Sequence, residues 1–275
     1  MRPESRLAFL LWLPVNAIQG LYTVLLTTVG ITIALAITLV VRRPGPALWM
    51  ARRVWAPGLL RGAGARLSVT GLERLDLTRP ALLVANHQSW IDIPALFRAV
   101  PGPLLFLAKS ELAGVPFLGA YIRAMGMVFV DRSNVRRASR SVGRAAELLG
   151  QGCFLVSFPE GTRSRDGRPG PFRSGGFGAA LETGTDVVPV ALVGPAAVLP
   201  RDGFKVRPGR IEVRFGHPIP TADLAPGSRA ALARRAEAAV RALLAGETQP
   251  APEPAAEPVL GLEPRPVEVR PGEMR

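Results

Sequence analysis

The feature that most constrains this chain is the uncharged run from residue 7 to residue 41. As one helix at ~1.5 Å per residue it would be ~52 Å long, more than the ~30 Å hydrocarbon core of a bilayer. Four residues are expected to interrupt it: Pro14, Asn16, Gln19 and Gly20. We therefore expect residues 21–41 to form a helix of spanning length. The alternative is a two-helix hairpin within the run that enters one leaflet.

Basic residues follow this run, and arginine carries nearly all of the formal net charge of +13. Arginines are dense from residue 42 to residue 79, where Glu73 and Asp76 are the only acids. This pattern suits an anionic membrane surface and predicts a domain on the cytoplasmic side of a bacterial inner membrane. A GC-rich genome is the alternative source of the arginines. Aromatic residues are few and no nucleic-acid motif is present, so nucleic acid is not an expected partner.

Apolar strand-like segments alternate with helical patterns in the middle of the chain. Buried strands are expected at residues 81–85, 104–108, 127–130, 153–158 and 187–193, and an edge or half-buried strand at 211–215. Helices are expected at residues 90–99, 134–149, 176–183 and 228–245. This alternation predicts an α/β fold, with a mixed, largely parallel sheet flanked by helices and preceded by a membrane-embedded helical segment.

Composition divides the chain into three parts. Residues 1–60 form a membrane anchor that ends in an interfacial helix at 46–60, where Trp49 and Trp55 stand between arginines. Residues 61–246 form the α/β domain. Residues 247–275 are rich in proline and glutamate and poor in large apolar side chains, so they are expected to be a disordered tail.

The first candidate site lies where a predicted buried strand gives way to a helix, at residues 86–92 (Asn-His-Gln-Ser-Trp-Ile-Asp). His87 can accept a proton near neutral pH, and Asp92 can hold one ring nitrogen. In a continuous helix the two side chains would point ~140° apart, so they meet only if His87 lies in the turn before the helix. A chance spacing, or a histidine that only caps the helix, is the alternative.

The second candidate site is the segment 158–164 (Phe-Pro-Glu-Gly-Thr-Arg-Ser), which also follows an apolar strand. Exposed backbone amides at Gly161 and Thr162 and the guanidinium of Arg163 are the groups that a phosphate monoester needs. Glu160 would repel phosphate, so it is expected to accept hydrogen bonds from a substrate hydroxyl or from backbone amides, or to hold Arg163. An ordinary turn is the alternative.

Together these segments resemble the glycerolipid acyltransferase family, in particular the lysophosphatidic acid acyltransferases. The ordered family blocks match at residues 86–92, 109–112, 126–132, 158–164 and 188–190, and the resemblance covers residues 71–218. Each block is only moderately specific, but the ordered set is highly specific. Many relatives carry lysine after the Pro-Glu-Gly block, whereas this chain has Arg173.

The resemblance implies a role for each matched residue. His87 would take the proton of a lysophospholipid hydroxyl that attacks an acyl thioester, and Asp92 would orient His87. The residues expected to bind substrate are Lys109, Arg132, Glu160, Gly161, Thr162 and Arg163. Acyl-coenzyme A or acyl carrier protein would be the co-substrate, and no resident cofactor or metal is expected.

The resemblance predicts transfer of an acyl chain to 1-acylglycerol-3-phosphate, which gives phosphatidic acid. The motifs report the chemistry better than the headgroup, so lyso-ornithine lipid and other lysolipids stay open as acceptors. A membrane-bound ester or thioester hydrolase and a non-catalytic lipid-binding protein are the alternatives from other classes. The hydrolase would release free fatty acid, and the binding protein would not need His87.

Overall fold

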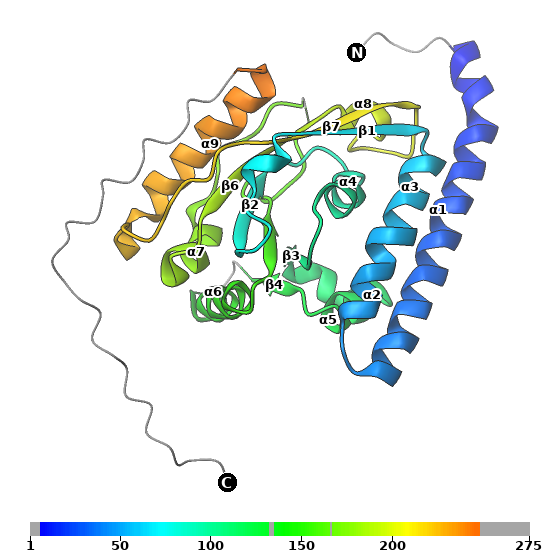
Figure 1. Cartoon of the computed structure of the whole chain (residues 1–275). Helices are drawn as coiled ribbons and strands as arrows, with labels where there is room; N and C mark the ends of the chain where they lie inside the picture. The colour runs from blue at the N-terminus through cyan, green and yellow to red at the C-terminus, as the bar shows by residue number, and fades with distance from the viewer. Residues whose placement is uncertain (1–5, 132–134, 166, 248–275) are drawn as a thin grey trace, which may run out of the picture.

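The computed structural model describes residues 6–131, 135–165 and 167–247. Within them, seven strands form one sheet in the order β1-β7-β6-β2-β5-β3-β4 (Figure 1). The strands are β1 (Ala65–Thr70), β2 (Ala81–Ala85), β3 (Leu104–Lys109), β4 (Val128–Val130), β5 (Phe154–Ser157), β6 (Val187–Val193) and β7 (Gly209–Phe215). Neighbours run parallel except β6 and β7, which are antiparallel. The predicted mixed, largely parallel sheet is confirmed.

Two apolar cores cover the two faces of the sheet. Strand β2 is buried along its whole length, as expected for a central parallel strand, and its side chains alternate between the cores. Leu83 and Ala85 pack on the side of the N-terminal helices and α4 (Asp92–Ala99), whereas Leu82 and Val84 pack on the opposite side. The helices on that opposite side are α6 (Val135–Gly150), α7 (Gly178–Thr183) and α9 (Arg229–Ala245).

The N-terminal run forms one continuous helix, α1 (Arg6–Val41), so the predicted interruption and the hairpin within the run are both wrong. Pro14 lies inside the helix without ending it. The polar residues make tertiary contacts instead. Gln19 Nε2 donates to the carbonyl of Gly62 at 3.2 Å, and Asn16 Oδ1 accepts from Arg207 at 3.5 Å.

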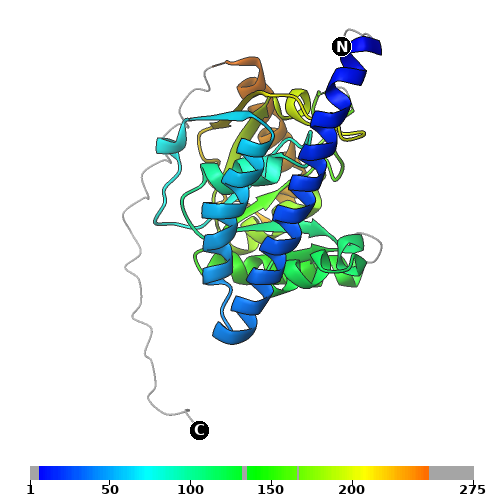
Figure 2. The same cartoon turned by 90° about the vertical axis from the view of Figure 1, so that its right-hand side faces the viewer.

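A second helical segment runs back along α1, so the two lie side by side in both views (Figures 1 and 2). It comprises α2 (Gly45–Met50), a π-helical turn η1 (Ala51–Trp55) and α3 (Ala56–Gly62). The π turn ends two residues before Pro57, which cannot donate a backbone hydrogen bond. The helix predicted at 46–60 is present. It forms a helical hairpin with α1, whereas the hairpin considered from the sequence would have lain entirely within residues 7–41.

Two further features differ from the expectation. Strand β1 was not predicted, because its alternation of small, apolar and polar side chains is short and weak. It pairs with β7, which is therefore an inner strand and not an edge, although its half-buried pattern is as expected. Most of the tail predicted from residue 247 lies outside the described residues.

Candidate active site

The turn between β2 and α4 carries the first candidate site. Strand β2 ends at Ala85 and α4 begins at Asp92, so His87 lies in the turn before the helix, as predicted. His87 Nδ1 lies 2.7 Å from Asp92 Oδ2. The expected contact between the two side chains is therefore confirmed.

Asp92 holds this turn together from inside the protein. Its side chain is fully buried, and its Oδ2 also accepts hydrogen bonds from the backbone amides of Gln88 at 2.7 Å and Ser89 at 2.9 Å. A carboxylate only accepts hydrogen bonds, so His87 Nδ1 carries the proton that it shares with Asp92. The Nε2 lone pair of the neutral ring is then left for a ligand, which is the tautomer that a general base needs.

Neighbouring side chains fasten the turn to the rest of the fold. The Asn86 amide donates to the carbonyl of Leu192 at 3.0 Å and accepts from its amide at 2.7 Å, which ties the turn to β6. Ser89 Oγ donates to the carbonyl of Leu199 at 2.6 Å. The His87 ring stacks on Phe158, with ring centroids 4.1 Å apart. The imidazole therefore has one orientation before any ligand binds.

Glu160 supports the turn from behind and does not line the cavity. Its Oε1 accepts from the backbone amide of His87 at 2.8 Å, and its Oε2 from that of Gly170 at 2.9 Å. Of the roles considered from sequence, acceptance from backbone amides is the one that the structure contains. Burial raises the pKa of this carboxyl, and the two amide hydrogen bonds offset part of the rise.

The loop after Phe158 is hydrogen-bonded both to the turn that carries His87 and to α9. The Ser164 amide donates to the His87 carbonyl at 2.7 Å, which joins the two candidate segments directly. From α9, Glu237 Oε2 accepts from the Phe172 amide at 2.9 Å, and Arg241 donates to the Pro169 carbonyl at 2.7 Å. The loop therefore connects α9 to the turn that carries His87.

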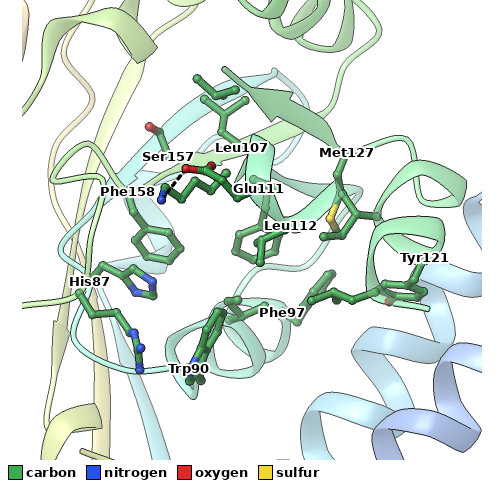
Figure 3. A pocket seen from close by; sticks show the side chains of 18 of the residues that line it. His87, Trp90, Phe97, Leu107, Glu111, Leu112, Tyr121, Met127, Ser157 and Phe158 are labelled. Carbon is green, nitrogen blue, oxygen red and sulfur yellow. Dashed lines mark ion pairs between the residues drawn. The ribbon is translucent and has the colours of Figure 1, made fainter. Parts of the chain in front are cut away.

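A cavity of about 1020 Å³ opens in front of His87. Figure 3 shows His87 and Phe158 at one side of it and Tyr121 and Met127 at the other. The His87 end also contains polar and cationic groups, whereas the far end lies among apolar side chains. Those apolar lining residues include Ile31, Trp55, Phe97, Phe106, Leu118 and Ile122. The cavity therefore suits a ligand with one charged end and one apolar end.

Most of the predicted substrate-binding residues line this cavity: Lys109, Gly161, Thr162 and Arg163. Arg173, which follows the second segment, lines it as well. Arg132 lies outside the described residues, so its predicted role stays a prediction. The structure brings the two motifs to one site, although it contains no ligand that tests the individual roles.

Of the cations at this end, Lys109 is held less firmly than the histidine. Lys109 pairs with Glu111 at 2.7 Å, and both side chains are more than half exposed (Figure 3). The Arg163 guanidinium donates to the carbonyl of Arg201 at 2.7 Å and lies 4.8 Å from the Trp90 ring centroid. Arg201 in turn donates to the carbonyl of Arg163 at 2.6 Å. This exchange holds the Arg163 side chain at the edge of the cavity.

Sequence reasoning missed the residues that α1 contributes. Thr23, Thr27 and Gly30 line the cavity, and the indole of Trp55 donates to Thr27 Oγ1 at 3.2 Å. These small residues recur at the helical spacing i, i+4, i+7, which was the available signal. The uncharged run at residues 7–41 was interpreted only as a membrane segment, so these residues were not expected to line a cavity.

Three comparisons with known proteins agree with this geometry. The acyltransferase family profile matches residues 66–193. This part of the chain is similar to the acyltransferase family. The match includes both candidate segments and leaves α1, α2, α3 and α9 outside it.

Several relatives are named 1-acyl-sn-glycerol-3-phosphate acyltransferase. A chloroplastic protein of Arabidopsis thaliana is 38% identical over 56% of this chain and 44% of its own length. A protein of the bacterium Borreliella burgdorferi is 33% identical over 47% of this chain and 52% of its own. The chain thus spans about half the length of these curated relatives.

A solved structure extends the likeness beyond the matched domain. The crystal structure of the 1-acyl-sn-glycerophosphate acyltransferase PlsC of Thermotoga maritima aligns with a TM-score of 0.70 and 28% identity. The alignment covers 84% of this chain and 95% of that one. The predicted fold class is therefore confirmed.

Proposed function

We propose that this protein transfers an acyl chain from a thioester to the free hydroxyl of 1-acylglycerol-3-phosphate and so makes phosphatidic acid. The observation that carries the proposal is the place of the His87–Asp92 pair. It lies at the end of a cavity that has cations beside it and an apolar arm beyond it. The names of the relatives support the same acceptor.

The chemistry follows from the tautomer of His87. The acceptor oxygen attacks the thioester carbonyl carbon while Nε2 takes the hydroxyl proton. The carbon–sulfur bond then breaks, and the thiolate leaves and takes up a proton. Buried Asp92 stabilises the imidazolium formed in between. General-base help of this kind contributes ~10²–10⁴-fold in rate, and fixed geometry contributes further.

The cavity offers a separate place for each part of the acceptor. Its phosphate fits beside Arg163, Arg173 and Lys109, where guanidinium groups can bind phosphate oxygens two at a time. Its acyl chain fits the apolar arm between α1, α4 and α5 (Leu118–Ala124). Acyl-coenzyme A or acyl carrier protein is the proposed donor. The absence of a cofactor or metal requirement stays a prediction.

The first helix suits membrane attachment. Residues 12–41 are the described part of the chain that is long and apolar enough to cross a bilayer, and little of this helix is buried. Yet Trp55 packs on Thr27 near the middle of α1, with Arg52 and Arg53 in the same turn of helix. A spanning α1 would carry these arginines toward the hydrocarbon centre at high cost. We therefore propose that α1 lies in one leaflet with its exposed face toward lipid.

The proposed location is the bacterial inner membrane, with the α/β domain on the cytoplasmic side. The density of arginine after α1 supports this orientation. Thr23 and Thr27 of α1 line the cavity, so a lysolipid can enter from the membrane without crossing water. The division into residues 1–60, 61–246 and 247–275 belongs to the same proposal.

An acceptor panel tests the proposal. The detergent-solubilised protein is offered labelled acyl-coenzyme A with lysophosphatidic acid, lyso-ornithine lipid, lysophosphatidylglycerol, glycerol-3-phosphate or water, and products are resolved by mass. Phosphatidic acid should be the main product. His87→Ala should reduce its formation by ~10²–10⁴-fold, whereas His217→Ala, at the other histidine of the chain, should not. Free fatty acid as the main product, or full activity in His87→Ala, contradicts the proposal.

A further inference from the structure

Three arginines converge at a second hollow, away from His87. Arg61 comes from the end of α3, Arg66 from β1 and Arg210 from β7. They line a shallow pocket of about 570 Å³ whose other walls are Gly64, Ala65, Pro208 and Gly209. No acidic side chain lines it. The pocket therefore concentrates positive charge with nothing on its walls to balance it.

The placement of these arginines is electrostatically unfavourable for the protein alone. Arg66 and Arg210 are direct neighbours across the β1–β7 pair, and like charges in that position destabilise a sheet. Among the described residues, none of the three guanidinium groups makes a hydrogen bond or an ion pair. An anion that bound between them would remove this repulsion.

The same sheet face shows how the chain neutralises an arginine elsewhere. Arg214 lies four residues beyond Arg210 on β7 and pairs with Glu212 at 2.7 Å. Thr70 on β1 donates to the same carboxylate at 3.4 Å. Arg214 thus has a partner on its own strand, whereas Arg66 and Arg210 at the start of these strands have none within residues 6–131, 135–165 and 167–247.

The backbone keeps the pocket open. Gly64 has a left-handed conformation with φ of 63°, which favours glycine. A Cβ atom there would lie 3.0 Å from the Pro208 side chain. The turn from α3 into β1 can therefore pack tightly against Pro208. The side chains of Arg61, Arg66 and Arg210 line the pocket around this contact.

The position of the pocket points to the membrane surface. The starts of β1 and β7 lie at the sheet edge where β2 ends before His87, because β7 runs antiparallel to β6. In the sheet order, β7 is two strand spacings from β2, roughly 9 Å, and β1 is three, roughly 14 Å. The α3 end that carries Arg61 is bonded to α1 through Gln19. Ile18 of α1, one residue away, is 69% exposed. An exposed apolar residue of α1 is thus next in sequence to the one that bonds the end of α3.

We propose that Arg61, Arg66 and Arg210 form a binding site for the phosphate group of an anionic membrane phospholipid, separate from the catalytic cavity. The site holds the domain edge against the headgroup layer while the exposed face of α1 contacts the acyl chains. Arginine suits this role because its planar guanidinium is always charged and binds phosphate oxygens in pairs. The site is independent of which acceptor the enzyme acylates.

Vesicle binding by the full chain tests the site. The readout is the ratio of affinity for vesicles containing phosphatidylglycerol to affinity for phosphatidylcholine vesicles, because contacts of α1 contribute to both. The combined variant Arg61→Gln, Arg66→Gln, Arg210→Gln should lower this ratio on the order of 100-fold, since each basic residue at an anionic surface contributes substantially. Its turnover with acceptor in uncharged detergent should be unchanged, which separates this site from the proposed catalytic one.

A matched control removes the same charge elsewhere: Arg140→Gln, Arg234→Gln, Arg235→Gln, at exposed positions on α6 and α9. It should lower the ratio by about threefold or less, since salt screens charges beyond ~10 Å. Equal losses in the two triple variants, or no loss in the first, overturn the proposal. Inorganic phosphate, compared with chloride at equal ionic strength, distinguishes the ligand. Phosphate should lower the wild-type ratio and leave that of the combined Arg61, Arg66 and Arg210 variant unchanged; a wild-type ratio that phosphate does not lower would overturn the assignment of a phosphate group to the pocket.

Discussion

The turn that carries His87 and the cationic end of the cavity face the same space but are built differently. In the turn, the side chains of Asn86, Ser89 and Asp92 are buried and bonded to backbone groups. At the cationic end, Lys109 is 65% exposed, and the partner found for it in the described part of the chain is an exposed glutamate. One region is rigid before a ligand arrives, and the other has side chains that can move toward one.

This difference separates the reaction from the choice of acceptor. Proton transfer needs a base within hydrogen-bond reach at a fixed angle, so a small loss of geometry in the turn should lower kcat. A phosphate can be bound by flexible cations from several directions, so a loss there should raise the acceptor KM. Variants in the turn should therefore change kcat, and variants at the cationic end should change the acceptor KM. The opposite result in either region would contradict this difference.

The largest effect is expected for Asp92→Asn. The asparagine can place its carbonyl oxygen where Asp92 Oδ2 lies and keep the hydrogen bonds from Gln88, Ser89 and His87. Its amide then takes the place of Oδ1, for which no partner is found in the described part of the chain. Geometry is kept while the charge that stabilises the imidazolium is lost. We expect kcat to fall by ~10³-fold with little change in KM.

Steady-state kinetics with lysophosphatidic acid measure this change, and Asp202→Asn, at an exposed site, is the control. A fall in kcat of less than tenfold would mean that orientation alone, without the charge, explains the role of Asp92. Circular dichroism should show an unchanged fold in both variants.

The next effect is expected at Arg163. Arg163→Met keeps much of the apolar side chain against Trp90 but removes the charge at the cavity edge and the hydrogen bond to the Arg201 carbonyl. We expect the KM for lysophosphatidic acid to rise about 30-fold, as for loss of a charged hydrogen bond, with a smaller change in kcat. Arg165→Met, exposed on the same loop, is the control. An unchanged KM would remove Arg163 from the phosphate site.

A smaller effect is expected at Glu160, because it acts through the backbone of the turn. Glu160→Gln replaces one acceptor oxygen with an amide that cannot accept from His87 N–H or Gly170 N–H. We expect kcat to fall about tenfold, the size of one lost hydrogen bond to a charged group, with the KM unchanged. Glu147→Gln, on an exposed face of α6, is the control. A rise in KM without loss of kcat would instead make Glu160 a direct ligand of the acceptor.

The same variant tests the pKa of Glu160. Burial raises this pKa, so the folded protein holds the proton more tightly than the unfolded chain does. Between the ordinary glutamate pKa and the raised one, this group therefore lowers stability as pH rises. The Tm of the wild type should fall relative to that of Glu160→Gln across this window. A difference in Tm that is independent of pH would contradict the raised pKa.

Local pattern was enough to predict much of the fold and the centre of the site. The buried strand expected at 81–85 and the helix expected at 90–99 predicted that His87 lies in the turn between them, and only local geometry decides whether it meets Asp92. Strand β1 was missed because its register comes from β7, far away in the chain. The continuity of α1 was missed because Gln19 is satisfied by Gly62 of α3, a tertiary contact with no local signal.

The apolar arm could not be predicted for the same reason. Its walls come from α1, α3, α4 and α5, and no single segment contains a motif for it. Glu160 shows that even a recognised motif does not predict every contact of its residues. Its position near the site was predicted, but its bond to the His87 amide depends on how two loops from non-adjacent segments meet. The motifs therefore predicted which residues lie near one another at the site. Only the packing of the fold decided which of their side chains point into the cavity.

The smallest effect is expected at Lys109, where the contrast between the two regions is sharpest. Its ammonium must leave Glu111 before it can bind a phosphate, so it gives up one ion pair to gain another, and both are exposed. Exposed pairs contribute little, so Lys109→Gln should raise the acceptor KM only about threefold and leave kcat unchanged. Glu111→Gln should lower the KM, because it releases Lys109 for the acceptor. Lys205→Gln is the matched control. Titration of acceptor at two salt concentrations measures both changes. KM changes of the same sign in the two variants would contradict a phosphate contact at Lys109.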